Sequence, residues 1–149
     1  MYVGYRYYDT LDRDVLFSFG HGLSYTTFST DALKIEADDK TLLVSVGVTN
    51  TGNISGSEVL QVYVAHETPS IRRPKKELKG FKKVYLEPGA REPVDISADI
   101  RYATSFWDEY KGAWKSESGK YKVLVGSGSQ GAFLEGHFQI DKTVYWKGL

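Results

Sequence analysis

The chain has 149 residues, and 41% of them are hydrophobic, which is enough apolar side-chain mass for one packed domain. Its 19 basic and 19 acidic residues cancel, and this balance argues against a dedicated nucleic-acid binder. Cysteine is absent, so disulfides and thiolate chemistry are excluded. The sequence lacks the run of roughly 20 apolar residues that a membrane span needs. We therefore expect neither nucleic acid nor a membrane as a partner.

Alternation of apolar and polar residues is the dominant pattern, and it predicts β-strands. In residues 41–49, Leu42, Val44, Val46 and Val48 fall on one face. In chain order, the expected strands cover residues 31–37, 41–49, 57–66, 77–86, 94–98, 120–125 and 134–140. Turn residues separate these segments, and no convincing helical period is present. The pattern predicts an all-β fold, an immunoglobulin- or fibronectin type III-like β-sandwich of about seven antiparallel strands, with an up-and-down barrel as the alternative.

Four details refine this expectation. Residues 57–66 are apolar on both faces, which is typical of a central strand. Gly80 lies inside an expected strand and indicates a bulge. Residues 99–112 are aromatic but irregular. Tyr121 follows a glycine turn at the start of a late strand, so it is a candidate for the tyrosine corner of such sandwiches, with an ordinary core tyrosine as the alternative.

Five stretches of the sequence carry a family resemblance. They are FSFGHGLSYTTF (17–28), VTNTGNISGSEVLQVYV (48–64), RPKKELKGFKKVYLEPG (73–89), SGKYKVLVGSGS (118–129) and YVGYRYYDT (2–10). The first four resemble the C-terminal fibronectin type III-like domain of family 3 glycoside hydrolases, the β-glucosidases and their relatives. The fifth is similar to the segment that leads into this domain from a preceding α/β sandwich domain. An aromatic segment follows Met1 at once, without a signal-peptide core, as expected for a piece of a longer protein.

The resemblance implies a division of the chain and a set of partners. Residues 1–28 would be the linker from the α/β sandwich domain, with its C-terminal part docked, and residues 29–149 the fibronectin type III-like domain. The partners would be the catalytic barrel and the α/β sandwich domain of the same parent chain. The parent family is retaining and carries its catalytic carboxylates on those other domains. Their motifs are absent here, so the resemblance transfers no catalytic residue, and we expect this chain alone not to be an enzyme.

The residues themselves give the same expectation. A retaining glycosidase needs two carboxyl groups roughly 5–5.5 Å apart across a cleft. The pair Asp38 and Asp39 lies between two strands, where turns favour aspartate, and Asp108 and Glu109 follow an aromatic pair that a core or rim position explains. The three histidines lie on separate elements, which does not favour a metal site. We expect no metal and no cofactor.

Aromatic residues supply the candidate binding surfaces. The domain-interface candidates are Tyr2, Tyr5, Arg6, Tyr7, Tyr8, Phe19, His21 and Tyr25. The polymer-binding candidates are Tyr110, Trp114, Tyr145 and Trp146. The leading hypothesis is an accessory domain that packs against and stabilises the catalytic domains. The alternative is a module that anchors the enzyme to a plant cell-wall polymer such as cellulose or lignin.

The N-terminal segment is expected to behave as two parts. Residues 16–19 and 23–28 are apolar and should dock on the sandwich. Residues 2–14 carry tyrosines but almost no aliphatic anchor, and should be loosely held because ordering a backbone residue costs roughly 1–2 kcal/mol. Residues 72–83 contain seven basic residues and one glutamate. They are expected to form a solvated face, with an acidic neighbouring surface or an anionic polymer as the alternative.

Overall fold

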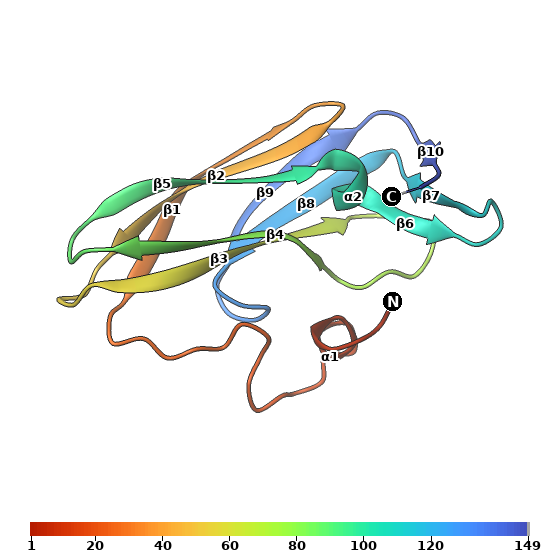
Figure 1. Cartoon of the computed structure of the whole chain (residues 1–149). Helices are drawn as coiled ribbons and strands as arrows, with labels where there is room; N and C mark the ends of the chain where they lie inside the picture. The colour runs from red at the N-terminus through yellow and green to blue at the C-terminus, as the bar shows by residue number, and fades with distance from the viewer. Residues whose placement is uncertain (149) are drawn as a thin grey trace.

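Two antiparallel sheets face each other in the computed structural model, which describes residues 1–148 (Figure 1). The first sheet has the order β1-β2-β5, formed by β1 (Phe28–Ala37), β2 (Thr41–Asn50) and β5 (Arg91–Asp99). The second has the order β4-β3-β8-β9, formed by β4 (Glu77–Leu86), β3 (Gly56–His66), β8 (Gly119–Gly126) and β9 (Leu134–Ile140). These seven strands are the seven that the alternation predicted, and they confirm the sandwich.

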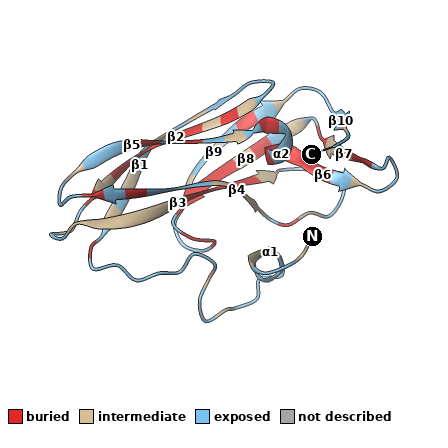
Figure 2. Ribbon diagram, in the orientation of Figure 1, coloured by how far each residue is buried: buried red, intermediate tan, exposed pale blue. Residues whose placement is uncertain are grey.

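The core lies between the two sheets and is formed by alternate residues of their strands. Figure 2 shows buried positions along strands of both sheets. The prediction for residues 41–49 is confirmed, since Leu42, Val44, Val46 and Val48 are all buried. β3 lies between β4 and β8, as its apolar faces predicted. Opposite Val62 and Tyr63, the pairing with β4 shifts register beside Gly80, which confirms the bulge.

A third, smaller sheet and two short helices were not predicted. β6 (Ser105–Asp108), β7 (Ala113–Ser116) and β10 (Val144–Trp146) form an antiparallel sheet of order β10-β7-β6 at one end of the sandwich (Figure 1). Helix α1 covers Tyr5–Thr10, and α2 covers Ile100–Thr104. No helix in the described range is long and apolar enough to cross a membrane.

Tyr121 forms the tyrosine corner. Its ring is completely buried between His66 and Phe138. Its hydroxyl donates to the carbonyl oxygen of Glu117, four residues upstream, over 2.8 Å. Burial raises the pKa of the Tyr121 hydroxyl to about 12, so the group keeps its proton and stays a donor at neutral pH. The corner therefore ties the start of β8 to the chain that enters it.

We expect Tyr121→Phe to lower the free energy of unfolding by about 1–2 kcal/mol, because the Glu117 carbonyl would lose a buried hydrogen-bond donor. Urea denaturation followed by circular dichroism measures this. Tyr110→Phe is the matched control, because Tyr110 is fully exposed and its substitution should leave the midpoint unchanged. Equal midpoints for Tyr121→Phe and the wild type would reduce Tyr121 to a packing residue.

Candidate interaction surfaces

The outer face of the four-stranded sheet carries a buried tyrosine. Leu60, Val62 and Val64 of β3 point into the core, so Gln61 and Tyr63 point outward. Tyr63 nevertheless has 0% of its surface exposed. The rings of Tyr5 and Phe133 meet it edge-on, at centroid distances of 5.7 and 6.1 Å. Burial raises the pKa of Tyr63, and its hydroxyl donates to the side-chain carbonyl of Gln61.

Helix α1 supplies this cover. Tyr5 stacks on Phe19 with ring centroids 5.2 Å apart. The Tyr5 hydroxyl accepts a hydrogen bond from the backbone N–H of Leu78 in β4, over 2.6 Å. Figure 1 shows the helix and the segment that follows it lying beneath the sheet that contains β3 and β4. The N-terminal segment is thus part of the domain's packing.

An ion pair fixes the end of the same helix. The Lys76 ammonium lies 2.7 Å from the Asp9 carboxylate, and the two side chains are 12% and 6% exposed. Gln130, from the loop after β8, donates a second hydrogen bond to Asp9 over 3.3 Å. Lys76 also lies near the rings of Tyr63 and Phe133, at 5.8 and 5.5 Å from their centroids. Lys76 therefore makes an ion pair and cation–π contacts at the same time.

A second cluster joins the helix to β4 through Glu77. Its carboxylate lies 3.6 Å from Arg6, 3.0 Å from Arg73 and 3.5 Å from Lys79. Burial alone would raise the pKa of Glu77, but the attraction of the three cations outweighs it and holds that pKa below its ordinary value. One carboxylate therefore compensates three cations, Arg6 of α1, Arg73 of the loop before β4 and Lys79 of β4.

These contacts reverse the expectation for the N-terminal segment. Residues 5–10 dock through Tyr5, Arg6 and Asp9, whereas Leu16 and Leu23 are 95% exposed. The basic run 72–83 is likewise not a plain solvated face, because its central side chains bind the acidic residues of the N-terminal segment and Glu77. The expectation of a loosely held segment was wrong for residues 5–10. For the basic run, Lys82 and Lys83 are exposed as expected, whereas Lys76 meets the alternative, an acidic neighbouring surface, at Asp9 of the same chain. The C-terminal part of the segment does dock at Thr26, whose hydroxyl bonds Asn50 over 2.6 Å.

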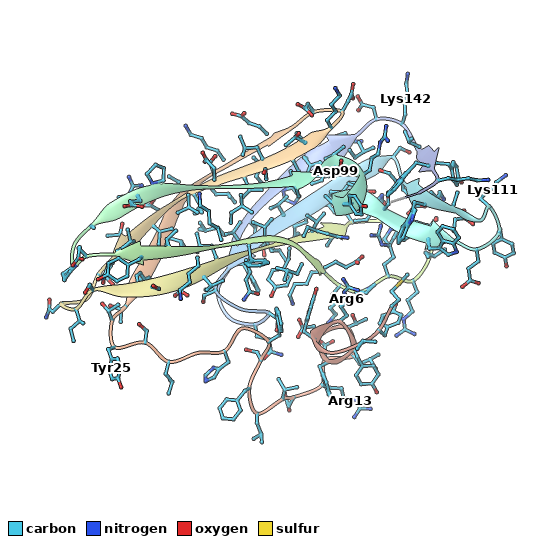
Figure 3. The ribbon with its side chains drawn as sticks, in the orientation of Figure 1. Arg6, Arg13, Tyr25, Asp99, Lys111 and Lys142 are labelled. Carbon is cyan, nitrogen blue, oxygen red and sulfur yellow. The ribbon has the colours of Figure 1, made fainter. Side chains whose placement is uncertain are left out.

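The remaining interface candidates lie at or near the surface. Tyr7 and Tyr8 are exposed and contact each other edge-on at 5.4 Å, and Tyr2 lies under the Arg72 guanidinium at 5.9 Å. His21 is exposed beside Phe17, and Tyr25 projects from the segment before β1 with 96% of its surface exposed (Figure 3).

Exposed apolar side chains are distributed unequally between the two sheets. On the outer side of the four-stranded sheet lie Phe17, Leu23, Tyr25, Phe81 and Tyr85, all exposed. β1, β2 and β5 expose no large hydrophobic side chain in the described part of the chain. Their outer face carries polar contacts instead, such as the Arg91–Asp31 ion pair and a 2.6 Å hydrogen bond from Ser45 to Asp95. Only the first of these surfaces has the composition of an interface.

The four polymer-binding candidates do not form one platform. Trp146 is paired with Trp114, and Tyr145 with Lys115, so Tyr145 points to the opposite face of the small sheet. Tyr110 lies in the β6–β7 turn, near Lys111 at the end of the molecule (Figure 3). A flat polymer cannot stack on all four rings together, and the polymer-binding hypothesis stays a prediction.

One member of each carboxylate pair has a structural task. One oxygen of Asp38 accepts hydrogen bonds from the backbone N–H groups of Lys40 and Thr41, and these bonds lower its pKa. One oxygen of Asp108 accepts from Tyr110 and Lys111 in the same way. Both arrangements are turns stabilised by aspartate. Within residues 1–148, no group of three potential ligand side chains is placed to hold a metal ion.

Comparisons with known proteins agree with this fold. The profile of the fibronectin type III-like domain matches residues 58–129. A probable β-glucosidase H of Neosartorya fischeri is 47% identical over the whole chain, and a putative β-glucosidase of Schizosaccharomyces pombe is 46% identical over the whole chain. The chain spans only 18% of the length of each relative.

Solved structures give the same result. The β-glucosidase of Kluyveromyces marxianus in complex with glucose superposes with a TM-score of 0.95 at 47% identity, covering 99% of this chain and 18% of that one. β-Glucosidase 3B of Thermotoga neapolitana superposes with a TM-score of 0.90 at 39% identity, covering 99% of this chain and 20% of that one.

We expect Lys76→Met to release helix α1, because it leaves the buried Asp9 carboxylate without its counter-ion. Breaking such a pair costs about 3 kcal/mol, which corresponds to roughly hundredfold faster amide exchange in residues 5–10. Hydrogen exchange with mass spectrometry measures this. Lys83→Met, at an exposed position of β4, is the control. Unchanged exchange in Lys76→Met would show that the aromatic contacts alone hold the helix.

The Glu77 cluster predicts a pH dependence. A depressed folded-state pKa contributes stability above the unfolded value, and this contribution is lost as the pH falls below 4.5, the ordinary value for glutamate. Glu77→Gln should therefore be less stable than the wild type at neutral pH and show a shallower loss below pH 4.5. Part of the slope should persist, because the pKa of Glu117 is also lowered, by Lys115 and Ser70 against the opposing effect of burial. Glu36→Gln, at an exposed position of β1, should keep the full slope.

Proposed function

Since the chain is a fibronectin type III-like domain of the kind carried by family 3 β-glucosidases, we propose that it is the non-catalytic accessory domain of such an enzyme and packs on its catalytic domains. The supporting observation is the one-sided apolar surface. The N-terminal segment is fixed on the four-stranded sheet by Tyr5 and Asp9, yet it holds Phe17 and Leu23 out into solvent.

This arrangement is costly for an isolated domain and useful for a docked one. A rigid segment that exposes large apolar side chains gains roughly 1.5–3 kcal/mol for each one that a partner covers. The relatives contain more than four-fifths of their length outside the region that this chain matches. The rest of the parent chain, covalently joined to this segment, is therefore the partner best placed to cover these apolar side chains. Under this proposal, the domain contributes stability and orientation to the enzyme and no catalytic group.

The substitution pair Phe17→Ser and Leu23→Ser tests the proposal in two contexts. The first is the isolated chain. The second is a chimera in which this chain replaces the matching part of the Kluyveromyces marxianus β-glucosidase. In the isolated chain the two side chains already face water, so stability should change by less than about 0.5 kcal/mol. In the chimera the pair should lower the domain's stability by about 3 kcal/mol or more.

Hydrogen exchange at Val44 and Val46, in the core, reports the domain's stability in both contexts. Lys34→Ser, on the exposed side of β1, is the control that should have no effect in either. If the double substitution has equal effects in the isolated chain and in the chimera, the segment is not a docking surface and the proposal fails.

A further inference from the structure

The small sheet carries a row of three tryptophans that the domain itself does not cover. Trp107 of β6 is paired with Trp114 of β7, and Trp114 with Trp146 of β10, so the three indoles share one face. Their ring centroids are 5.6 and 5.7 Å apart. Tyr102 of α2 extends the row, 5.5 Å from Trp146. Trp107 remains 46% and Tyr102 49% exposed.

The small polar groups beside this row bond one another. The Trp146 indole N–H donates to the Ser105 hydroxyl over 3.0 Å. The hydroxyls of Thr104 and Ser116 lie 2.6 Å apart, and these two residues and Ser105 are buried. The outward surface of this face is therefore mainly aromatic. It has few polar side chains available for hydrogen bonds to a hydroxyl-rich ligand.

The ring orientations also disfavour a sugar platform. Trp107 and Trp114 are inclined by 77°, and Tyr102 and Trp146 by 69°. Trp114 and Trp146 are close to parallel, at 21°, and stack on each other. A sugar chain needs several open, similarly directed ring faces, whereas this arrangement forms a ridge of ring edges. Such a ridge has the shape and composition of a protein-binding hot spot, where tryptophan and tyrosine are enriched.

The ridge is preorganised. The Asp108 carboxylate holds the β6–β7 turn through the backbone N–H groups of Tyr110 and Lys111, over 3.0 and 3.1 Å. On the other face of the sheet, Phe106 is buried beneath the Arg73 guanidinium and the Lys115 ammonium. A partner would therefore spend little free energy on ordering this surface.

The position of the N-terminus indicates the occupant. The Tyr2 ring lies under the Arg72 guanidinium. Two residues earlier in the chain, the Ser70 backbone N–H donates to Glu117 and the Ser70 hydroxyl accepts from Lys115 of β7, in the small sheet. Figure 1 shows the N-terminus close to the end of the sandwich that carries β6, β7 and β10. A parent chain would leave the domain at this end.

We infer that the tryptophan ridge is a second docking surface for the part of the parent chain outside these 149 residues, separate from the surface around Phe17 and Leu23. The inference rests on the proposed function and adds to it the residues of a further contact. Its anchors are Trp107 and Tyr102, with Tyr110 at the tip of the turn.

Hydroxyl-radical footprinting oxidises exposed aromatic, aliphatic and proline side chains and is read by mass spectrometry, so it tests both surfaces in one experiment. Labelling is compared between the isolated chain and the chimera with the Kluyveromyces marxianus enzyme. Trp107 and Tyr110 should be labelled readily in the isolated chain and several-fold less in the chimera. Pro93, exposed on the outer face of β5, is the internal control and should label equally in both.

The outcomes separate the two proposals. Protection of Phe17 and Tyr25 with an unchanged Trp107 would leave the proposed function standing and overturn the ridge. If Phe17, Tyr25, Trp107 and Tyr110 are all labelled equally in the isolated chain and in the chimera, both proposals fail. Retention of the isolated chain on cellulose or soluble cello-oligosaccharide resin, abolished by Trp107→Ala and not by Tyr85→Ala, would also overturn the inference by assigning the ridge to sugar. Protection of Trp107 in the chimera without such retention supports it.

Discussion

The burial of Tyr63 under the N-terminal segment is the contact on which the arrangement of this surface depends. Tyr63 points away from the core, so one side of its ring would face water if helix α1 were not docked. The Tyr5 ring and the Lys76 ammonium cover it, and both are held by their own partners in β4 and α1. Because α1 is fixed, the residues that follow it are carried across the same face and present their apolar side chains outward.

The sandwich could be predicted from the sequence because its strands are long and its core is regular. Each of the seven strands spans at least seven residues, so alternation is visible within the strand itself. The tyrosine corner was an open alternative, because a hydroxyl's partner depends on the path of the chain before β8. The small sheet gave no local signal. Its strands have only three or four residues, and β10 pairs with β7 nearly thirty positions away in sequence.

The N-terminal segment shows why an apolar count alone misleads. Leu16 and Leu23 are two of the three leucines of the segment, and both are left in solvent. Docking is achieved instead by Asp9, Arg6 and one tyrosine hydroxyl, whose partners are Lys76, just before β4, and Glu77 and Leu78 in β4. The sequence did contain signs of this docking. The N-terminal segment is acidic, the run before and within β4 is basic, and β3 is apolar on both faces. Each has a plain local explanation, and only their pairing in space identifies the interface.

Fixing the segment also changes the thermodynamics of attachment to a parent chain. A flexible linker would let the domain sample many orientations, and docking would have to restrict them at a cost of roughly 1–2 kcal/mol for each residue ordered. Here residues 5–10 are already ordered by Tyr5 and Asp9, so the chain leaves the domain in one direction. The surface around Phe17 and Leu23 and the tryptophan ridge then have fixed positions relative to that exit. Two preorganised contacts on one rigid body add their free energies without a second loss of translational and rotational freedom. Under the proposed function, a modest area at each surface would therefore be sufficient to hold the domain in a single orientation.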